Sequence, residues 1–412
     1  MVAVTTPDLR HHGDSDAEPG LLDFAVNVRG ERPPAWLRER LVAAVDRLGH
    51  YPSAAEDRTA REAAAARHGR PPDEVLVLAG AAEGTALLPA LRPRLAAVVH
   101  PGFTEPEVAL RTAGVAVRRV LTSAAHGHRL RLSDVPAQAD MVVLGNPTNP
   151  TSVLHPAEEV RALARPGRVL VVDEAFADAV PGELESLAGA AGTGVPGLLV
   201  LRSLTKTWAL PGLRAGYALG APELLARLAA GRPPWPVGTL ALEAVVACSA
   251  PAAVAEAEAA ARQLAADRAW LADALSALPG VVVALPAAGP FLLLRVPRGE
   301  RVRAALRAAG IAVRRCDTFP GLTGDHLRVA VRPPALAAAL VTALADAVLA
   351  VSAVPPGGPA VSVPPKAPGG AGSPVVPEDD AAGGSVGAVA AVLRDGRDGA
   401  GYGAGVGRET RT

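Results

Sequence analysis

The chain has 412 residues, which is enough for two domains, and its 41 basic and 41 acidic side chains balance. A balanced charge gives no reason to expect nucleic acid or an anionic membrane surface as a partner. Aromatic residues make up only 3% of the chain, so alanine, valine and leucine must fill its core.

Neither secretion nor membrane insertion is indicated by the sequence. Residues 1–20 are expected to form a flexible arm, and they lack the basic patch and apolar run of a signal peptide. No stretch reaches the roughly 18 uninterrupted apolar residues that a membrane helix needs. The two cysteines, Cys248 and Cys316, are too few for a disulfide framework. We therefore expect a cytoplasmic protein.

Short apolar runs alternate with helical patterns between residues 74 and 219. This alternation predicts a mostly parallel sheet with helices on both faces. Ligands bind to such sheets outside the carboxyl ends of the strands. Four residues directly follow predicted strands: Gly80, Asn146, Asp173 and Ser203. They are therefore expected to lie at one edge of the sheet.

The second half of the chain predicts a smaller domain and a tail. A break at Pro233–Pro236 precedes a helical stretch at 239–278, which is interrupted at Pro251. Later strands and helices suggest a small α/β domain packed on the larger one. The end of the chain lacks the apolar area that would offset chain entropy, so we expect it to be disordered. The predicted divisions are an N-terminal arm with part of the small domain (1–45), a large domain (46–232), a small domain (233–350) and a tail (351–412).

One lysine, Lys206, lies between two apolar runs that are predicted strands. A buried cation is costly unless it has a partner or a function. Burial could remove its proton and make it a nucleophile for an aldehyde. Ser203 and Arg214 flank it and offer a hydroxyl and a guanidinium suited to phosphate. Taken alone, Lys206 would more often be a surface lysine in a loop.

Two motifs upstream change that interpretation. Asn146–Thr151 and Asp173–Phe176 precede the Ser203–Lys206 stretch and Arg214. This order resembles the fold-type I enzymes of the class I/II aminotransferase family, from about residue 12 to about residue 349. The resemblance implies pyridoxal 5′-phosphate as cofactor, a large and mostly parallel seven-stranded sheet domain, and a small α/β domain. It also implies a homodimer with a shared active site.

The resemblance assigns the reacting groups of the cofactor site. Lys206 would bond to the cofactor aldehyde, and the only other lysine, Lys366, falls in the predicted tail. Asp173 would keep the pyridine nitrogen protonated so that the ring can accept electrons. Without the resemblance, a strand-end aspartate would more often cap a turn. Glu174 is expected to point to the opposite face.

The remaining cofactor contacts also come from the resemblance. Phe103 matches the position that stacks on the ring, and Asn149 matches the donor to the ring's 3′-oxygen. Phe176 stands where many relatives have a tyrosine, so one donor to that oxygen is missing. Predicted phosphate contacts are the helix-start residues Ala81 and Ala82, the side chains Ser203 and Arg214, and Tyr51 reaching across from the other subunit.

Two arginines in the second half of the chain are candidates for binding the substrate. Arg328 matches the family arginine that binds the substrate α-carboxylate. Arg314 lies before that strand, and two arginines near one site suggest a doubly anionic substrate, such as a phosphorylated amino acid. Alternatively, Arg314 is a solvated charge at a strand end, which is the interpretation we favour for Arg295 and Arg332.

A closer resemblance is to threonine-phosphate decarboxylases of cobalamin biosynthesis, which are relatives of histidinol-phosphate aminotransferases. It rests on 173–176, 203–214 and 314–328. The sequence departs from it near Glu105–Pro106, where a tyrosine is common, and at Ala81–Ala82, where polar residues are common. We expect decarboxylation, with transamination to 2-oxoglutarate as the alternative, because sequence does not set which Cα bond stands perpendicular to the ring. No metal is expected. By position, the residues that would contact phosphothreonine are His12, Gly13, Asn27, Asn149, Arg314 and Arg328.

Overall fold

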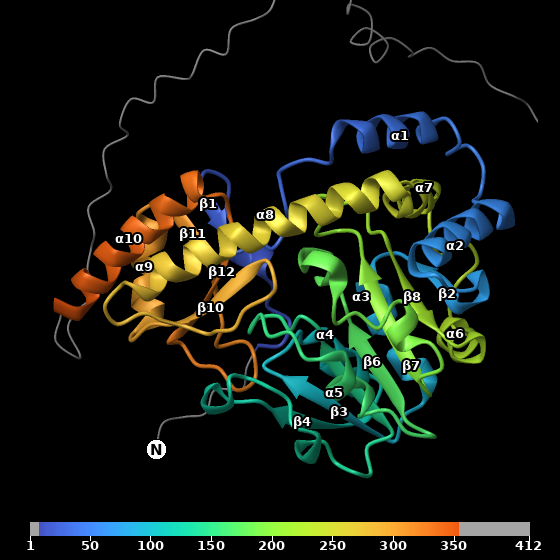
Figure 1. Ribbon diagram of the computed structural model, residues 1–412, viewed down its shortest axis with the longest axis horizontal. Coiled ribbons are helices and arrows are strands. Elements are labelled where there is room, and N and C mark those ends of the chain that lie inside the picture. The colour runs from blue at the N-terminus through green and yellow to red at the C-terminus, as the bar shows by residue number, and fades with distance from the viewer. Residues whose placement is uncertain (1–7, 354–412) are drawn as a thin grey trace, which may run out of the picture. The chain divides into compact units, whose positions relative to one another are not determined.

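The computed structural model describes residues 8–353, which form two β-sheets and the helices around them (Figure 1). Residues 351–353 belong to the last helix, α10 (Pro334–Ala353). The rest of the predicted tail, with Lys366, lies outside the described residues.

The larger sheet has seven strands in the order β2-β8-β7-β6-β5-β3-β4. Only β8 runs antiparallel to its neighbours, β7 and β2, and the other pairs are parallel. The prediction of a mostly parallel seven-stranded sheet is therefore confirmed. The strands are β2 (Val75–Leu78), β3 (Leu95–His100), β4 (Ala116–Leu121), β5 (Met141–Gly145), β6 (Val169–Asp173), β7 (Leu198–Ser203) and β8 (Gly216–Gly220).

Both faces of this sheet are covered, as the nearly continuous apolar strands require. Val171 and Val172 are neighbours on β6 but belong to cores on opposite faces, because strand side chains alternate. The helices on one face are α1 (Ala35–Val45), α2 (Ala54–His68) and α7 (Thr239–Ser249), and those on the other are α3 (Ala81–Leu87), α4 (Glu105–Thr112) and α6 (Pro222–Ala229). The short helix α5 (Ala157–Arg161) precedes β6.

Helix α2 shows how local sequence sets an element's ends. The Ser53 hydroxyl accepts a hydrogen bond from Glu56 N at 3.2 Å, and Glu56 accepts one from Ser53 N at 2.8 Å. This reciprocal pair is the capping box that Ser-x-x-Glu favours. The helix ends at Gly69, whose φ of 63° is left-handed and suits glycine.

The smaller sheet has five strands in the order β1-β11-β12-β10-β9. Its edge strand β1 (Leu22–Phe24) comes from the N-terminal part of the chain and runs parallel to β11. The domain boundaries at 45, 232 and 350 stay predictions. The other strands and the helix between them are β9 (Val282–Val283), β10 (Phe291–Arg295), α9 (Gly299–Ala308), β11 (Ile311–Arg315) and β12 (His326–Ala330).

The long helical stretch predicted after residue 239 is two helices. α7 ends at Ser249 and α8 (Pro251–Ser276) begins at once, with a bend of 72° between them. Pro251 has no N–H to continue the α7 ladder, so the chain turns there. Helix α8 then packs against α7 near the larger sheet and against α10 and β10 of the smaller one (Figure 1).

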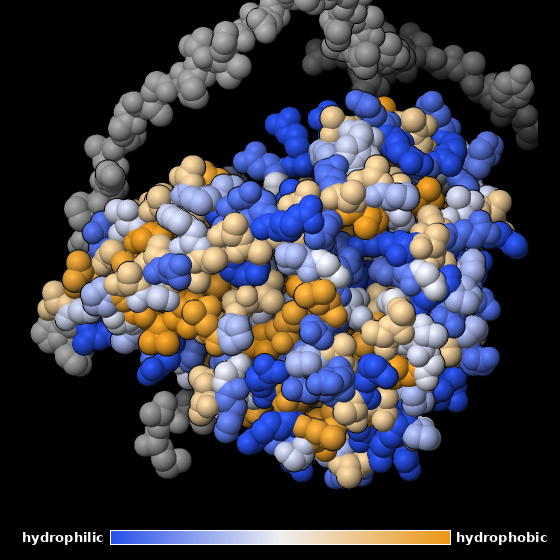
Figure 2. Space-filling model, in the orientation of Figure 1, coloured by the Kyte–Doolittle hydropathy of each residue, from blue (hydrophilic) through white to orange (hydrophobic). Residues whose placement is uncertain are grey.

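Helix α10 is strongly apolar, although Thr342 and Asp346 interrupt its apolar run. Among residues 8–353 it is the one helix long and apolar enough to cross a membrane, and the bent pair α7–α8 passes the same criteria only as a unit. One side of α10, including Leu340 and Leu344, is buried in the core of the smaller sheet. Buried core helices meet the same criteria of length and composition. On the face in Figure 2, hydrophobic residues gather over the smaller sheet, whereas hydrophilic ones prevail over α1 and α2.

Candidate active site

A cavity of about 570 Å³ lies where the carboxyl ends of β5, β6 and β7 face the smaller sheet. Parallel strands present their carboxyl ends at one edge, which is why residues far apart in sequence meet here. Of the residues predicted for the site, those lining the cavity are His12, Gly13, Asn27, Ala81, Ala82, Phe103, Asn149, Asp173, Ser203, Lys206, Arg214, Arg314 and Arg328.

Tyr51 is the exception. Its side chain is 74% exposed, stacks on Trp235 with ring centroids 4.3 Å apart, and lines neither of the two cavities described here. Within one chain it does not reach the other predicted residues. Its contact with a cofactor in a second subunit stays a prediction.

One end of the cavity can hold a phosphate. Ala81 and Ala82 open helix α3, and the first N–H groups of a helix have no partner within it. Gly80 precedes them with a φ of 83°, and a Cβ there would lie 3.1 Å from Nη2 of Arg214. Ser203 and Thr205 share a hydrogen bond between their hydroxyls beside the same wall. We did not predict Thr205 from the sequence, although it stands two residues after Ser203.

Asp173 and Lys206 contribute a carboxylate and an amine to the lining of the cavity. Burial raises the pKa of Asp173 to about 6, although Ala175 N donates to its Oδ1 at 3.0 Å and the Lys206 charge opposes the rise. Burial, helped by the charges of Arg328 and Arg214, lowers the pKa of Lys206 to about 8. A large fraction of Lys206 is therefore a neutral, nucleophilic amine at mildly alkaline pH.

The turn that carries Lys206 is held on both sides. Its carbonyl accepts a hydrogen bond from Arg29 N at 2.9 Å. The next residue, Thr207, donates its hydroxyl to Asp178 Oδ2 at 3.2 Å. These contacts tie the lysine's backbone to the N-terminal segment and to the turn after β6.

Arg314 and Arg328 are neighbours across the β11–β12 pair, yet their surroundings differ. Arg314 is not a solvated strand-end charge, because it is 2% exposed and its Nη1 lies 3.3 Å from Oδ2 of Asp16. Its Nη2 donates to Thr318 at 2.8 Å. The described part of the N-terminal arm, which we expected to be flexible, is thus held against the smaller sheet through buried Asp16.

Arg328 has no carboxylate partner among residues 8–353. Its Nη1 donates to Asn149 Oδ1 at 2.6 Å, its Nη2 donates to Ala25 O at 2.5 Å, and its Nε is buried without a partner. Burial and the nearby Arg314 lower its pKa to about 10. Arg328 is therefore a buried cation whose charge no described anion pairs with, at a cavity wall.

Two further residues at this end were not predicted as site residues: Glu105, which was noted only as a departure, and Asp14. His12 Nε2 lies 2.7 Å from Glu105 Oε1, and the His12 ring is 6.0 Å from that of Phe103. Asp14, in the short turn Gly13–Asp16, also lines the cavity. No local pattern marks Asp14 in the sequence, because only the docking of the arm brings it here.

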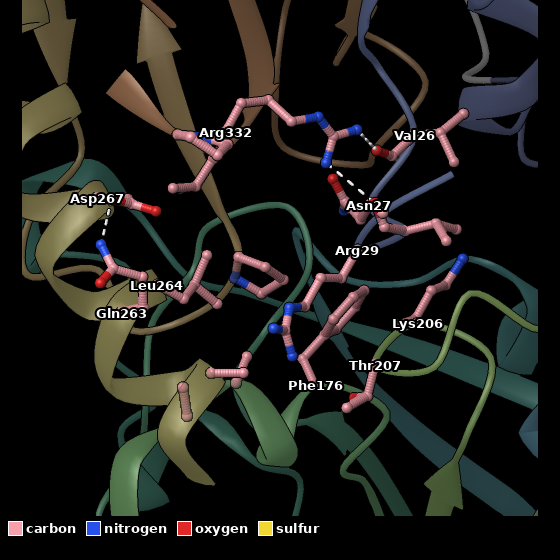
Figure 3. A pocket seen from close by; sticks show the side chains of 18 of the residues that line it. Val26, Asn27, Arg29, Phe176, Lys206, Thr207, Gln263, Leu264, Asp267 and Arg332 are labelled. Atoms are coloured by element: carbon pink, nitrogen blue, oxygen red, sulfur yellow. Dashed lines mark hydrogen bonds between the residues drawn. The ribbon is translucent and has the colours of Figure 1, made fainter. Parts of the chain in front are cut away.

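A second cavity of about 660 Å³ lies beside the first, between α8 and residues 21–31 (Figure 3). Lys206, Asn27 and Phe176 line both cavities. Arg332 was expected to be a solvated charge, but it donates to the carbonyls of Asp23, Val26 and Val28 at 2.8–3.2 Å. Although this cavity is larger, the predicted polar residues gather in the first.

The groups in the first cavity fit pyridoxal 5′-phosphate. A lysine amine, a buried carboxylate and a cradle of N–H, hydroxyl and guanidinium donors match the aldehyde, pyridine nitrogen and phosphate. Asn149 Nδ2 remains to donate to the ring oxygen, because its Oδ1 is held by Arg328. Phe176 packs edge-on against Phe291 and offers no hydroxyl to that oxygen. Residues 8–353 hold no group of three His, Cys, Asp or Glu that could bind a metal ion.

Known proteins share this arrangement. The pattern of the aminotransferase class I and II family matches residues 20–348. A histidinol-phosphate aminotransferase of Mycobacterium bovis is 54% identical over 333 residues, which cover 80% of this chain and 90% of that protein. A threonine-phosphate decarboxylase of Salmonella typhimurium is 32% identical over 344 residues, which cover 81% and 92%.

The fold is shared with solved structures. One is histidinol-phosphate aminotransferase from Sinorhizobium meliloti in complex with pyridoxal-5′-phosphate, with a TM-score of 0.69 and 20% identity, over 79% of this chain and 90% of that one. This likeness and the seven-stranded sheet confirm the type I fold. With the family pattern and a highly similar relative extending over most of its length, the chain belongs to the class I and II aminotransferases, enzymes that depend on pyridoxal phosphate.

Proposed function

We propose that the protein is an aminotransferase of the histidinol-phosphate type, which moves an amino group from a phosphorylated amino alcohol to 2-oxoglutarate. The relative at 54% identity carries that name, and the relative named as a decarboxylase is 32% identical. The decarboxylase expected first from the sequence is therefore the weaker candidate, and transamination, the alternative, becomes the proposal.

This choice rests on a difference between Arg314 and Arg328: only Arg314 is paired with a carboxylate of the described residues. Phosphothreonine bears its carboxylate and its phosphate on adjacent carbons, so it needs two free cations side by side. Arg314 is already paired with Asp16, so of these two arginines only Arg328 lacks a carboxylate partner among the described residues. A substrate with a single phosphate beside its amine, such as histidinol phosphate, needs only one such cation.

The residues that line the first cavity have distinct roles in this proposed reaction. When bound, pyridoxal phosphate supplies an aldehyde that captures the substrate amine and a ring that withdraws electrons from Cα. Asp173 keeps the pyridine nitrogen protonated, and Arg214 with Ser203 holds the phosphate. With its pKa lowered to about 8, Lys206 Nζ would remove the proton from the substrate Cα and deliver it to the former aldehyde carbon of the cofactor. Arg328 holds the anionic group of the substrate so that this proton faces Lys206.

An assay with two product readouts tests the proposal. Protein supplied with pyridoxal phosphate, histidinol phosphate and 2-oxoglutarate is expected to form glutamate. Phosphothreonine without an acceptor is expected to release no CO₂ above background. Lys206→Ala should abolish glutamate formation, whereas Lys366→Arg should not change it. Release of CO₂ from phosphothreonine faster than glutamate formation would overturn the proposal in favour of the decarboxylase.

A further inference from the structure

The substrate end of the first cavity carries two carboxylates for which the cofactor has no use. Glu105 is the first residue of α4, and its Oε1 lies 2.7 Å from His12 Nε2. Its Oε2 accepts no hydrogen bond from residues 8–353. Asp14, on the N-terminal arm, also lines this cavity; it is exposed and makes no hydrogen bond or ion pair with the described residues, and its charge opposes the lowering of the Lys206 pKa. Both side chains therefore have acceptor oxygens open to a ligand.

Two carboxylates are an obstacle to a substrate that is only anionic. The buried charge of Arg314 does not cancel them, because Asp16 already compensates it. A ligand that bears a phosphate, a carboxylate and otherwise only a methyl group would be repelled by these two carboxylates. It would also have no side-chain donor to form a hydrogen bond with either of them. The cavity therefore suits a ligand whose phosphate goes to Arg328 and whose other end donates hydrogen bonds.

We propose that Glu105 and Asp14 form a subsite for the imidazole ring of the substrate, with His12 as the residue that orients Glu105. A ring N–H would donate to Glu105 Oε2 or to the Asp14 carboxylate, while the His12 bond fixes Glu105 through its other oxygen. This inference rests on the proposed function and makes Glu105 and Asp14 determinants of its substrate specificity.

The location of Glu105 at a helix start does not by itself account for these contacts. An acidic side chain in the first turn of a helix is favoured by the helix dipole wherever the helix lies. Glu158, in the first turn of α5, occupies such a position and is exposed, outside both cavities. Glu105, by contrast, is joined to His12 on the cavity wall. Glu158 is therefore the matched control for removing a carboxylate from a helix start.

The test compares two substrates that differ only in the ring. Phenylalaninol phosphate keeps the amine, the phosphate and a flat ring of histidinol phosphate, but its ring has no N–H. Wild-type protein is expected to prefer histidinol phosphate in kcat/KM by roughly 10- to 100-fold, the range for a hydrogen bond to a charged group. Glu105→Gln and Asp14→Asn should each reduce that preference several-fold, and the double variant should nearly remove it. Glu158→Gln should leave it unchanged.

The variants should lose kcat/KM for histidinol phosphate while that for phenylalaninol phosphate stays the same or rises. A calorimetric titration of Lys206→Ala protein with histidinol phosphate gives a binding readout without turnover, and Glu105→Gln in that background should weaken binding by a similar factor. Retention of the wild-type preference by the double variant would overturn this inference alone. No glutamate from histidinol phosphate with wild-type protein would instead overturn the proposed function.

Discussion

Of the three arginines that line the cavity with Lys206, two have charges that lower its pKa, Arg328 and Arg214. Burial and the charges of Arg328 and Arg214 lower the pKa of Lys206 to about 8, from 10.5 for an ordinary lysine. A neighbouring cation disfavours the ammonium form, so removing that cation must raise the pKa again. At pH 8 the fraction of neutral amine should then fall.

Arg328→Gln is therefore expected to slow, by several-fold at pH 8, the reaction of the Lys206 amine with an amine-reactive label. The labelling rate would be measured in cofactor-free protein that carries Lys366→Arg, so that Lys206 is the sole lysine. Mass spectrometry would quantify the labelled peptide that contains Lys206 at pH values from 7 to 11. Arg214→Gln should act in the same direction if Arg328→Gln fails to fold. Arg295→Gln, at an exposed strand end, should not move the profile. An unmoved profile in both cavity variants would contradict this origin of the pKa.

At the scale of elements, strand β7 joins two different polar environments. Ser203 faces the cavity, whereas Arg202 before it lies buried with charged partners. Arg202 Nη1 is 3.1 Å from Glu174 and 2.6 Å from Glu183, and its Nη2 pairs with Asp178. Glu174 does not line the cavity, and burial raises its pKa. This cluster fastens β7 to the turns after β6.

Removing Arg202 leaves the buried carboxylate of Glu174 without a cation, whereas Asp178 and Glu183 keep their pairs with Arg67. We expect Arg202→Met to lower the free energy of unfolding by about 3–5 kcal/mol, the usual result of breaking a buried pair. Urea denaturation followed by circular dichroism measures it. The control, Arg262→Met, breaks an exposed pair with Glu258 and should cost less than about 1 kcal/mol. Equal costs for the two variants would show that the cluster contributes little to stability.

At the scale of the whole molecule, the predicted homodimer would give a function to the exposed, stacked rings of Tyr51 and Trp235. Tyr51 stacks on Trp235 outside both cavities, which suits a side chain that completes a second subunit's site. If its hydroxyl reaches the phosphate there, Tyr51→Phe should weaken cofactor binding about tenfold, since a hydrogen bond to a charged group is lost. The stacking should survive.

Mixed dimers separate this arrangement from one within a single chain. A hybrid of Tyr51→Phe and Lys206→Ala subunits should regain one tight cofactor site, because the intact lysine and the intact tyrosine then meet across the interface. Size-exclusion chromatography with light scattering checks the dimer itself. A hybrid whose best site is as weak as that of Tyr51→Phe alone would place the tyrosine in its own chain's site.

Much of the fold could be predicted because it follows from local pattern. Continuous apolar runs such as β6 and β7 must be covered on both faces, so alternation with helices leads to a mostly parallel sheet. The same geometry places strand-end residues such as Asp173 and Ser203 at one edge. The bend at Pro251 was also predictable, since proline cannot continue the ladder of α7.

The sequence by itself therefore determined the sheet, the edge at which the site forms and the single described lysine available to it. Tertiary structure alone decided which charges are compensated. Arg314 meets Asp16 across 298 positions of the chain, Arg328 meets Asn149 across 179, and His12 meets Glu105 across 93. Charge compensation depends on distance in space, which no local pattern encodes for residues so far apart. That compensation, rather than the residue types, separates the two arginines that looked equivalent in the sequence.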